Sequence, residues 1–277
     1  MKTKALIILL SSLIITSCGQ TISLSREEES DSPKEEEIVP NEDVKQKSVS
    51  ELTEDEYIYF PVLYLNKLDS LKSYKAVTTG STKSTVLFIN VNQEINTTVI
   101  KGEYLYQHNS SYSSVYSSEH EAFYHEGKAL YKNKGEEEYS ISSLKDYLDK
   151  YGTYPFNNTI EGYKISKDSI VNITKEENDE DNYQFKLVFN VENATNNVRI
   201  QMKEFGQLDD YPVFDSVEIT ITVKNDFTPI RLDLESKYTA KKVTNSSCHQ
   251  TYTVTYSNIN EEIEIPNIEK ARELFNS

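Results

Sequence analysis

The chain has 277 residues, with 29 lysines and arginines against 45 aspartates and glutamates, so its formal net charge is −16 at pH 7. Nucleic-acid binding needs a basic stripe that pairs with phosphates, and no such stripe occurs in the sequence. We therefore expect no nucleic-acid partner.

The first 17 residues have the pattern of an export signal. Lys2 and Lys4 form a short basic start, and an apolar run extends from Ala5 to Ile15. This run is too short to span a hydrocarbon core of about 30 Å, which needs about 20 residues at helical rise. It has the length of the apolar part of a signal peptide, so residues 1–17 are predicted to be one.

The residues that end this signal, Ile15-Thr16-Ser17-Cys18, resemble the lipobox of bacterial lipoproteins. The resemblance implies that diacylglycerol is joined to the Cys18 sulfur and that the chain is cut before it. Two or three acyl chains, at about 0.8 kcal/mol per buried CH₂, make a stable anchor. We expect a protein held by lipid at the extracytoplasmic face of a cell membrane. An ordinary secretory signal is the alternative.

Residues 18–56 are predicted to form a disordered acidic tether. Between Arg26 and Glu56 there are thirteen acidic and four basic residues, and the first aromatic residue is Tyr57. Such a segment buries too little apolar surface to offset the entropy of ordering. The remaining residues, 57–277, are enough for one domain with a core of its own. The abundance of Asn, Lys and Ile is typical of an AT-rich genome, as in low-GC Gram-positive bacteria.

The domain is predicted to be mostly antiparallel β-sheet. Apolar residues occupy alternate positions over residues 217–223 and 230–238, and Asn225-Asp226 between them favours a turn. Residues 252–256 alternate again, and 263–265 are expected to form a short edge strand. About ten or eleven strands are expected in all. The others cover residues 74–79, 85–92, 96–100, 103–108, 122–125, 129–132, 138–141 and 183–191, with Gly80, Gly102, Gly127 and Gly135 as separators.

A few helices are expected between the strands. The predicted helices cover residues 56–71, 142–151, 193–205 and 267–275. Pro61 favours the start of the first helix, Ser142 or Ser143 is a candidate cap for the second, and Gly206 favours the end of the third.

This order of elements resembles LolA-like and LppX-like lipoproteins. The resemblance rests on a leading helix that ends near Tyr74, a long meander, a helical insertion before Val217, and the closing stretch from Tyr256 to Pro266. It implies an α+β fold: one strongly curved antiparallel sheet, a half-barrel, with helices on its concave side. Named members of these families carry lipids or lipoproteins under those helices. Fold alone does not deliver function.

A hydrophobic ligand, if bound, would contact the apolar face of the strands at 183–191 and 217–223 and the helix at 193–205. A filled core at these positions is the other reading, because apolar helix faces are more often core than pocket. The candidate ligand-binding residues are Phe185, Leu187, Ile219, Val198, Met202 and Phe205.

No catalytic, metal-binding or cofactor-binding residue is predicted. His120 and His125 are five residues apart, whereas a zinc-protease helix needs a spacing of four. The acidic run that begins at Asn178 lacks the glycine of a calcium loop, and a solvated hairpin tip is expected there. Cys248 has His249 beside it, but neighbours on a strand face opposite ways. An enzyme is therefore the least favoured class.

Three functions remain open: a carrier of a lipid or other amphiphile, a protein-interaction module, and a structural component of the cell envelope. The interaction module would use a tyrosine-rich sheet face, since tyrosine suits interfaces. Its tyrosines would be Tyr104, Tyr106, Tyr112, Tyr116, Tyr124 and Tyr131.

Overall fold

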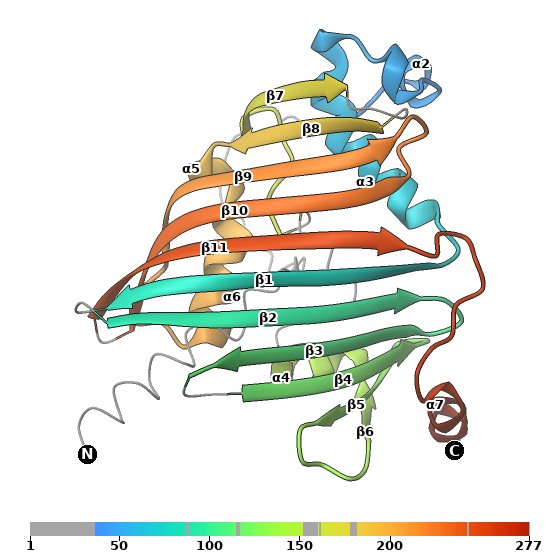
Figure 1. The fold of residues 1–277 in the computed structure, drawn as a ribbon, viewed down its shortest axis with the longest axis vertical. Helices are drawn as coiled ribbons and strands as arrows, with labels where there is room; N and C mark the ends of the chain where they lie inside the picture. The colour runs from blue at the N-terminus through green and yellow to red at the C-terminus, as the bar shows by residue number, and fades with distance from the viewer. Residues whose placement is uncertain are drawn as a thin grey trace.

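The computed structural model describes residues 37–86, 89–114, 117–151, 160, 162–177, 182–242 and 244–276. In this part of the chain, eleven strands form one open antiparallel sheet in the order β6-β5-β4-β3-β2-β1-β11-β10-β9-β8-β7 (Figure 1). The predicted fold class is confirmed. None of the described helices is long and apolar enough to cross a membrane.

The strands are β1 (Tyr74–Val86), β2 (Ile89–Lys101), β3 (Leu105–Ser113), β4 (Ser117–His125), β5 (Lys128–Asn133), β6 (Ser140–Ser143), β7 (Ile170–Glu177), β8 (Asn182–Phe189), β9 (Val213–Lys224), β10 (Pro229–Lys242) and β11 (Thr244–Ser257). The α-helices are α2 (Glu42–Lys45), α3 (Phe60–Ser70), α4 (Leu144–Tyr151), α5 (Val191–Ala194), α6 (Asn196–Gly206) and α7 (Ile268–Phe275), and the 3₁₀-helices are η1 (Val49–Glu51) and η2 (Glu54–Tyr59).

Two meanders make up the sheet, and the pairing of β1 with β11 joins them. This register runs from Lys75 opposite Ser257 to Thr85 opposite Ser247. As a result, β6 and β7 follow each other along the chain but lie at opposite edges of the sheet (Figure 1). The connection between them therefore passes from one edge of the sheet to the other. It contains α4 and the buried residues Ile160 and Tyr163.

One face of the sheet, called the inner face here, packs against α3, α4 and α6. Tyr64 of α3, Tyr147 of α4 and Met202 of α6 belong to the same buried cluster as the alternating residues of β9, such as Ile219 and Ile221. All three helices lie on the same side of the sheet in Figure 1. The main core thus lies between these helices and the inner face.

The C-terminal helix α7 covers part of the opposite, outer face. Ala271 of α7 is buried in a second cluster with Tyr106, Phe123 and Leu130, which alternate with the inward residues of β3, β4 and β5. The ring of Phe275 stacks on that of Tyr104 with 5.5 Å between centroids. This half of the sheet is therefore apolar on both faces, which explains why alternation in its sequence is weak.

Several predicted boundaries are wrong. The expected break at Gly80 does not exist, because β1 continues through it to Val86. Residues 263–265 form no strand, although Ile265 is buried against the outer-face cluster, and β7 was not predicted. The third predicted helix is split into α5 and α6, and its left-handed terminal residue is Gln207 rather than Gly206. The second predicted helix is α4, which begins at Leu144. The Oγ of Ser143 caps it by accepting a hydrogen bond from the backbone amide of Asp146 at 3.1 Å.

Part of the predicted tether is folded. In residues 37–56, the side chains of Ile38, Val44, Val49 and Leu52 are buried in the main core. The amide of Val49 donates to the carbonyl of Asn225 in the turn between β9 and β10, at 2.8 Å. The domain therefore begins no later than Glu37, and not at residue 57. The predicted signal peptide and Cys18 lie outside the described residues.

Gly80 is needed because the ring of Tyr252 lies directly over it. A Cβ added at Gly80 would lie 2.0 Å from Tyr252 Cδ1 and 2.5 Å from the carbonyl oxygen of Thr251. Overpacking of this kind costs about 1–3 kcal/mol. We expect Gly80→Ala to lower the free energy of unfolding by that amount in denaturant titrations.

The control for this prediction is a double-mutant cycle with Tyr252→Ala, which removes the overlapping ring. Gly80→Ala should cost less in the Tyr252→Ala background, where only the Thr251 carbonyl remains close. An equal cost in both backgrounds would show that the ring is not the cause.

Candidate functional site: the inner face of the sheet

The inner face is uncharged over the central strands. Every second residue of β1 and of β11 faces inward, as the burial of Ala76, Val86, Cys248 and Val254 shows, and none of these inward residues is acidic or basic. The same holds for β10 between Leu232 and Ala240. The charged residues of these strands point outward, among them Lys83, Asp233 and His249.

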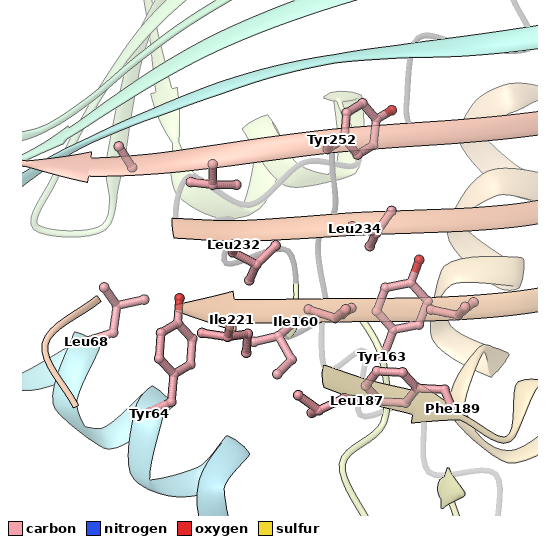
Figure 2. Close-up of a cluster of buried hydrophobic side chains, with 14 of the residues drawn as sticks. Tyr64, Leu68, Ile160, Tyr163, Leu187, Phe189, Ile221, Leu232, Leu234 and Tyr252 are labelled. Atoms are coloured by element: carbon pink, nitrogen blue, oxygen red, sulfur yellow. The ribbon is translucent and has the colours of Figure 1, made fainter. Parts of the chain in front are cut away.

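The part of the inner face over β8, β9 and β10 is a filled apolar core. The ring of Phe185 stacks on Phe60 of α3 with 3.7 Å between centroids, and Tyr57 meets it edge-on at 5.5 Å. Figure 2 shows Ile160 and Tyr163, from the connection between β6 and β7, beside Leu187 and Phe189. Protein side chains therefore occupy this region.

The structure brings five of the six candidate ligand-binding residues into this core. Phe185, Leu187 and Ile219 are 0 % exposed, Met202 is buried with them, and Val198 is partly buried against the same cluster. Phe205 is partly buried but is not part of the cluster. Contact of these residues with a ligand stays a prediction.

A continuous set of uncharged polar side chains lies beside the apolar core. Ser236 Oγ donates to Gln250 Oε1 at 3.1 Å, and Gln250 Nε2 in turn contacts Tyr252 Oη and lies 3.5 Å from Thr82 Oγ1. On the next strands, Gln93 Nε2 donates to Ser111 Oγ. We call this set the inner polar belt. Its members are Ser236, Gln250, Tyr252, Thr82, Gln93 and Ser111, and cross-strand register places Ser236, Gln250, Thr82 and Gln93 in one row.

Two buried acceptors on the inner face have no hydrogen bond within the described part of the chain. They are Oε1 of Gln93, whose residue is only 2 % exposed, and Oγ of Ser246. A buried polar atom without a partner costs about 1–3 kcal/mol, so each such atom in a native protein calls for an explanation. Gln93 thus presents an unsatisfied acceptor on β2, at the end of the row that Ser236, Gln250 and Thr82 begin.

At the far side of the inner face, His120 of β4 is held by hydrogen bonds on both ring nitrogens. Nδ1 lies 2.9 Å from Asn133 Oδ1, and Nε2 lies 2.7 Å from the hydroxyl of Tyr147. The amide nitrogen of Asn133 donates to Glu136 and Tyr151, so its Oδ1 is the acceptor. Nδ1 therefore carries the proton and Nε2 accepts from Tyr147. Burial lowers the pKa of His120, which favours this neutral form.

The other sequence candidates do not join these residues. His120 faces inward and His125 outward, and no group of three or more His, Cys, Asp or Glu residues able to hold a metal occurs in the described ranges. Cys248 is buried, 3.4 Å from Ser84 Oγ, and burial raises the pKa of its thiol. His249 points away and pairs with Glu235 at 2.9 Å. Residues 178–181 of the acidic run lie outside the described residues, and the next residue, Asn182, begins β8.

The tyrosine-rich surface is not exposed as predicted. Tyr104, Tyr106, Tyr124 and Tyr131 are all buried, and Tyr116 lies outside the described residues. Tyr112 alone among the described tyrosines of that set is exposed, at 64 %. An interaction surface built on the set as a whole is therefore ruled out.

No protein-family model and no curated protein matches the chain. Similar solved structures include LprF from Mycobacterium bovis, at 12 % identity and a TM-score of 0.37, covering 77 % of this chain and 97 % of LprF. A DUF1329 family protein from Desulfovibrio piger has 10 % identity and a TM-score of 0.28, covering 78 % and 96 % of the two chains. A LolA superfamily protein from Nitrosomonas europaea has 10 % identity and a TM-score of 0.25, covering 74 % and 94 %. Likenesses this distant support no inference about function.

The inner polar belt was not predicted from the sequence. A signal for it exists in β11, where alternation assigns Cys248, Gln250, Tyr252 and Val254 to one buried face. A glutamine on such a face needs a buried partner, and Gln250 could have been singled out for that reason. Gln93 is harder to find, because its row partner Thr82 is known only from the register of β1 with β2.

The neutral state of His120 predicts how stability depends on pH. Its pKa in the folded chain lies below the ordinary value of 6.5, so the unfolded chain binds the proton at a higher pH than the folded chain. The stability that it contributes is present above pH 6.5 and is lost as the pH falls through the folded-state pKa. In denaturant titrations, the free energy of unfolding should fall less between about pH 7.5 and about pH 5.5 for His120→Gln than for the unaltered chain.

The matched control is His249→Gln, which changes an outward-facing histidine on β11. In this variant, the decrease in the free energy of unfolding at acid pH that depends on His120 should remain. An unchanged fall in His120→Gln would contradict the assignment.

Proposed function

We propose that the chain is an extracytoplasmic lipoprotein whose inner sheet face binds an uncharged amphiphile. The observation that carries the ligand proposal is the pairing of an apolar core with a buried, uncharged polar belt that includes the unsatisfied acceptor Gln93 Oε1. In this proposal the polar group of the ligand bonds to the inner polar belt, and its apolar chain lies along the border of the filled core, not within it. The membrane anchor rests on the sequence around Cys18.

The absence of inward charge on the central strands defines the ligand class. Burial of an ionised group without a charged partner costs several kcal/mol, and no inward side chain of β1, β10 between Leu232 and Ala240, or β11 could supply that partner. A hydroxyl or amide carries no such cost, and it donates the hydrogen bond that Gln93 Oε1 lacks. An uncharged polar group joined to an apolar chain therefore fits the inner face better than an ionised lipid.

The anchor can be tested by changing Cys18 in the full-length chain. We expect Cys18→Ser to abolish incorporation of radioactive fatty acid in a bacterial host, because the hydroxyl cannot take the place of the thiol. The buried thiol Cys248 supplies the matched control, since Cys248→Ser leaves the proposed attachment point intact. Equal labelling of Cys18→Ser and the unaltered chain would contradict the proposal.

The ligand can be tested by native mass spectrometry of residues 19–277, which include every residue that the structure describes. Bound species would be released and identified after purification without detergent. We expect an uncharged amphiphile at one per chain. Gln93→Leu should weaken its binding by about threefold to tenfold, the value of one hydrogen bond.

Gln107→Leu is the matched control for Gln93→Leu. Gln107 is equally buried and faces inward on the neighbouring strand β3, but its Oε1 already accepts from Tyr124 at 3.3 Å. Its replacement should leave ligand occupancy within about twofold of the unaltered chain. A chain that carries no amphiphile and binds none when monoacylglycerol is added would contradict the proposal, as would preferential binding of an anionic phospholipid.

A further inference from the structure

The outer face of the sheet carries a groove that the proposed inner-face site does not use. Two hollows of about 500 Å³ and about 420 Å³ adjoin there and share Glu119 and Lys134. The first extends over β1 to β4, and the second continues over β3 to β5. We call the two together the outer groove. Side chains that line it include Thr79, Glu94, Asn96, Ser110, Tyr112 and Glu119.

Cross-strand register confirms that this groove lies on the outer face. Thr79 is opposite Asn96, and Asn96 is opposite Ser110 in the next strand. Ile95 and Ser111 also border the first hollow, although their side chains face inward. Five adjacent strands at about 4.8 Å spacing give the groove a length of about 19 Å across the sheet. It can therefore hold an extended molecule rather than a compact one.

The middle of the outer groove presents polar groups that have no partners. The side chains of Glu94, Asn96 and Tyr112 make no hydrogen bond, ion pair or ring contact with the described part of the chain. Other outward side chains do pair, as Arg231 does with Asp233 at 2.6 Å and, within the groove, His108 with Glu119 at 2.9 Å. The groove thus combines an exposed aromatic ring with a free carboxylate and a free amide.

We propose that the outer groove binds a neutral polysaccharide strand. Tyrosine has an apolar ring face and a polar hydroxyl, which suit the C–H face and the hydroxyl groups of a sugar ring. Carboxylate and amide oxygens accept hydrogen bonds from sugar hydroxyls, and Glu94 and Asn96 offer them beside Tyr112. The cell envelope is rich in glycans, so the proposed location brings such a strand within reach.

Charge, backbone pairing and exposure disfavour an anionic partner, an added β-strand and a protein side-chain anchor. The groove contains four carboxylates against two lysines, and the whole chain has a net charge of −16, so an anionic partner would be repelled. A peptide that adds a strand needs a free sheet edge, but β1 to β4 are each paired on both sides. A side-chain anchor would need a desolvated pocket, whereas Tyr112 is 64 % exposed.

Calorimetric titration of residues 19–277 with defined oligosaccharides tests the proposal. The neutral probes are cellohexaose, mannohexaose and hexa-N-acetylchitohexaose, and the anionic probe is hexagalacturonate. We expect at least one neutral hexasaccharide to bind and hexagalacturonate not to bind. Tyr112→Ala should weaken binding by about tenfold, as the loss of one ring contact does, and Glu94→Gln should weaken it less.

Tyr211→Ala is the matched control, because Tyr211 is also exposed, at 43 %, and does not line the groove. It should bind as the unaltered chain does. The Tyr112 side chain makes no hydrogen bond, ion pair or ring contact with the described residues, so Tyr112→Ala should keep the unfolding midpoint of the unaltered chain. Tyr211→Ala removes a ring whose centroid lies 4.1 Å from Lys203 Nζ, so a small decrease of its midpoint is expected. Failure of every neutral hexasaccharide to bind would overturn the proposal, and so would equal binding by Tyr112→Ala. Binding of an unfolded casein chain in place of any sugar would also overturn it. Gln93→Leu tests the inner face separately, since Gln93 does not line the groove.

Discussion

The pairing of β1 with β11 is the constraint on which the rest of the structure depends. It joins two meanders into one sheet and puts β6 and β7 at opposite edges. The chain between those strands must then pass from edge to edge, and it contributes α4, Ile160 and Tyr163 to the inner core. The topology thus supplies part of the cover of the inner face, and α3 and α6 supply the rest.

This cover divides the inner face into two regions with different chemistry. Over β8 to β10, aromatic and aliphatic side chains such as Phe60 and Phe185 pack against one another and are buried. Over β10, β11, β1 and β2, uncharged hydrogen-bonding side chains lie among the buried apolar residues, and Gln93 Oε1 has no hydrogen-bond partner in the described part of the chain. On β1, on β11 and on β10 between Leu232 and Ala240, charged side chains are confined to the outer face. The proposed amphiphile follows from this contrast between neighbouring regions.

Sequence patterns predicted the elements whose signals are local. Strands β9, β10 and β11 have one buried and one solvated face, so alternation from Val217 onward identified them. Pro61 and Ser143 marked helix starts for equally local reasons. Gly80 was misread because its role comes from the ring of Tyr252, which is distant in sequence.

Contacts between residues distant in sequence explain two failures of prediction, the expected disorder of residues 37–56 and the missing inner polar belt. Val49 and its aliphatic neighbours are buried only because the turn at Asn225 receives them, and the local composition of that segment favours disorder. The inner polar belt likewise depends on register between strands that are far apart in the chain. The ligand proposal can be decided by a high-resolution crystal structure of the chain purified from its own host. We expect an uncharged amphiphile on the inner face, with a donor group within hydrogen-bond distance of Gln93 Oε1. An inner face that holds only protein side chains and a single water at Gln93 would contradict it.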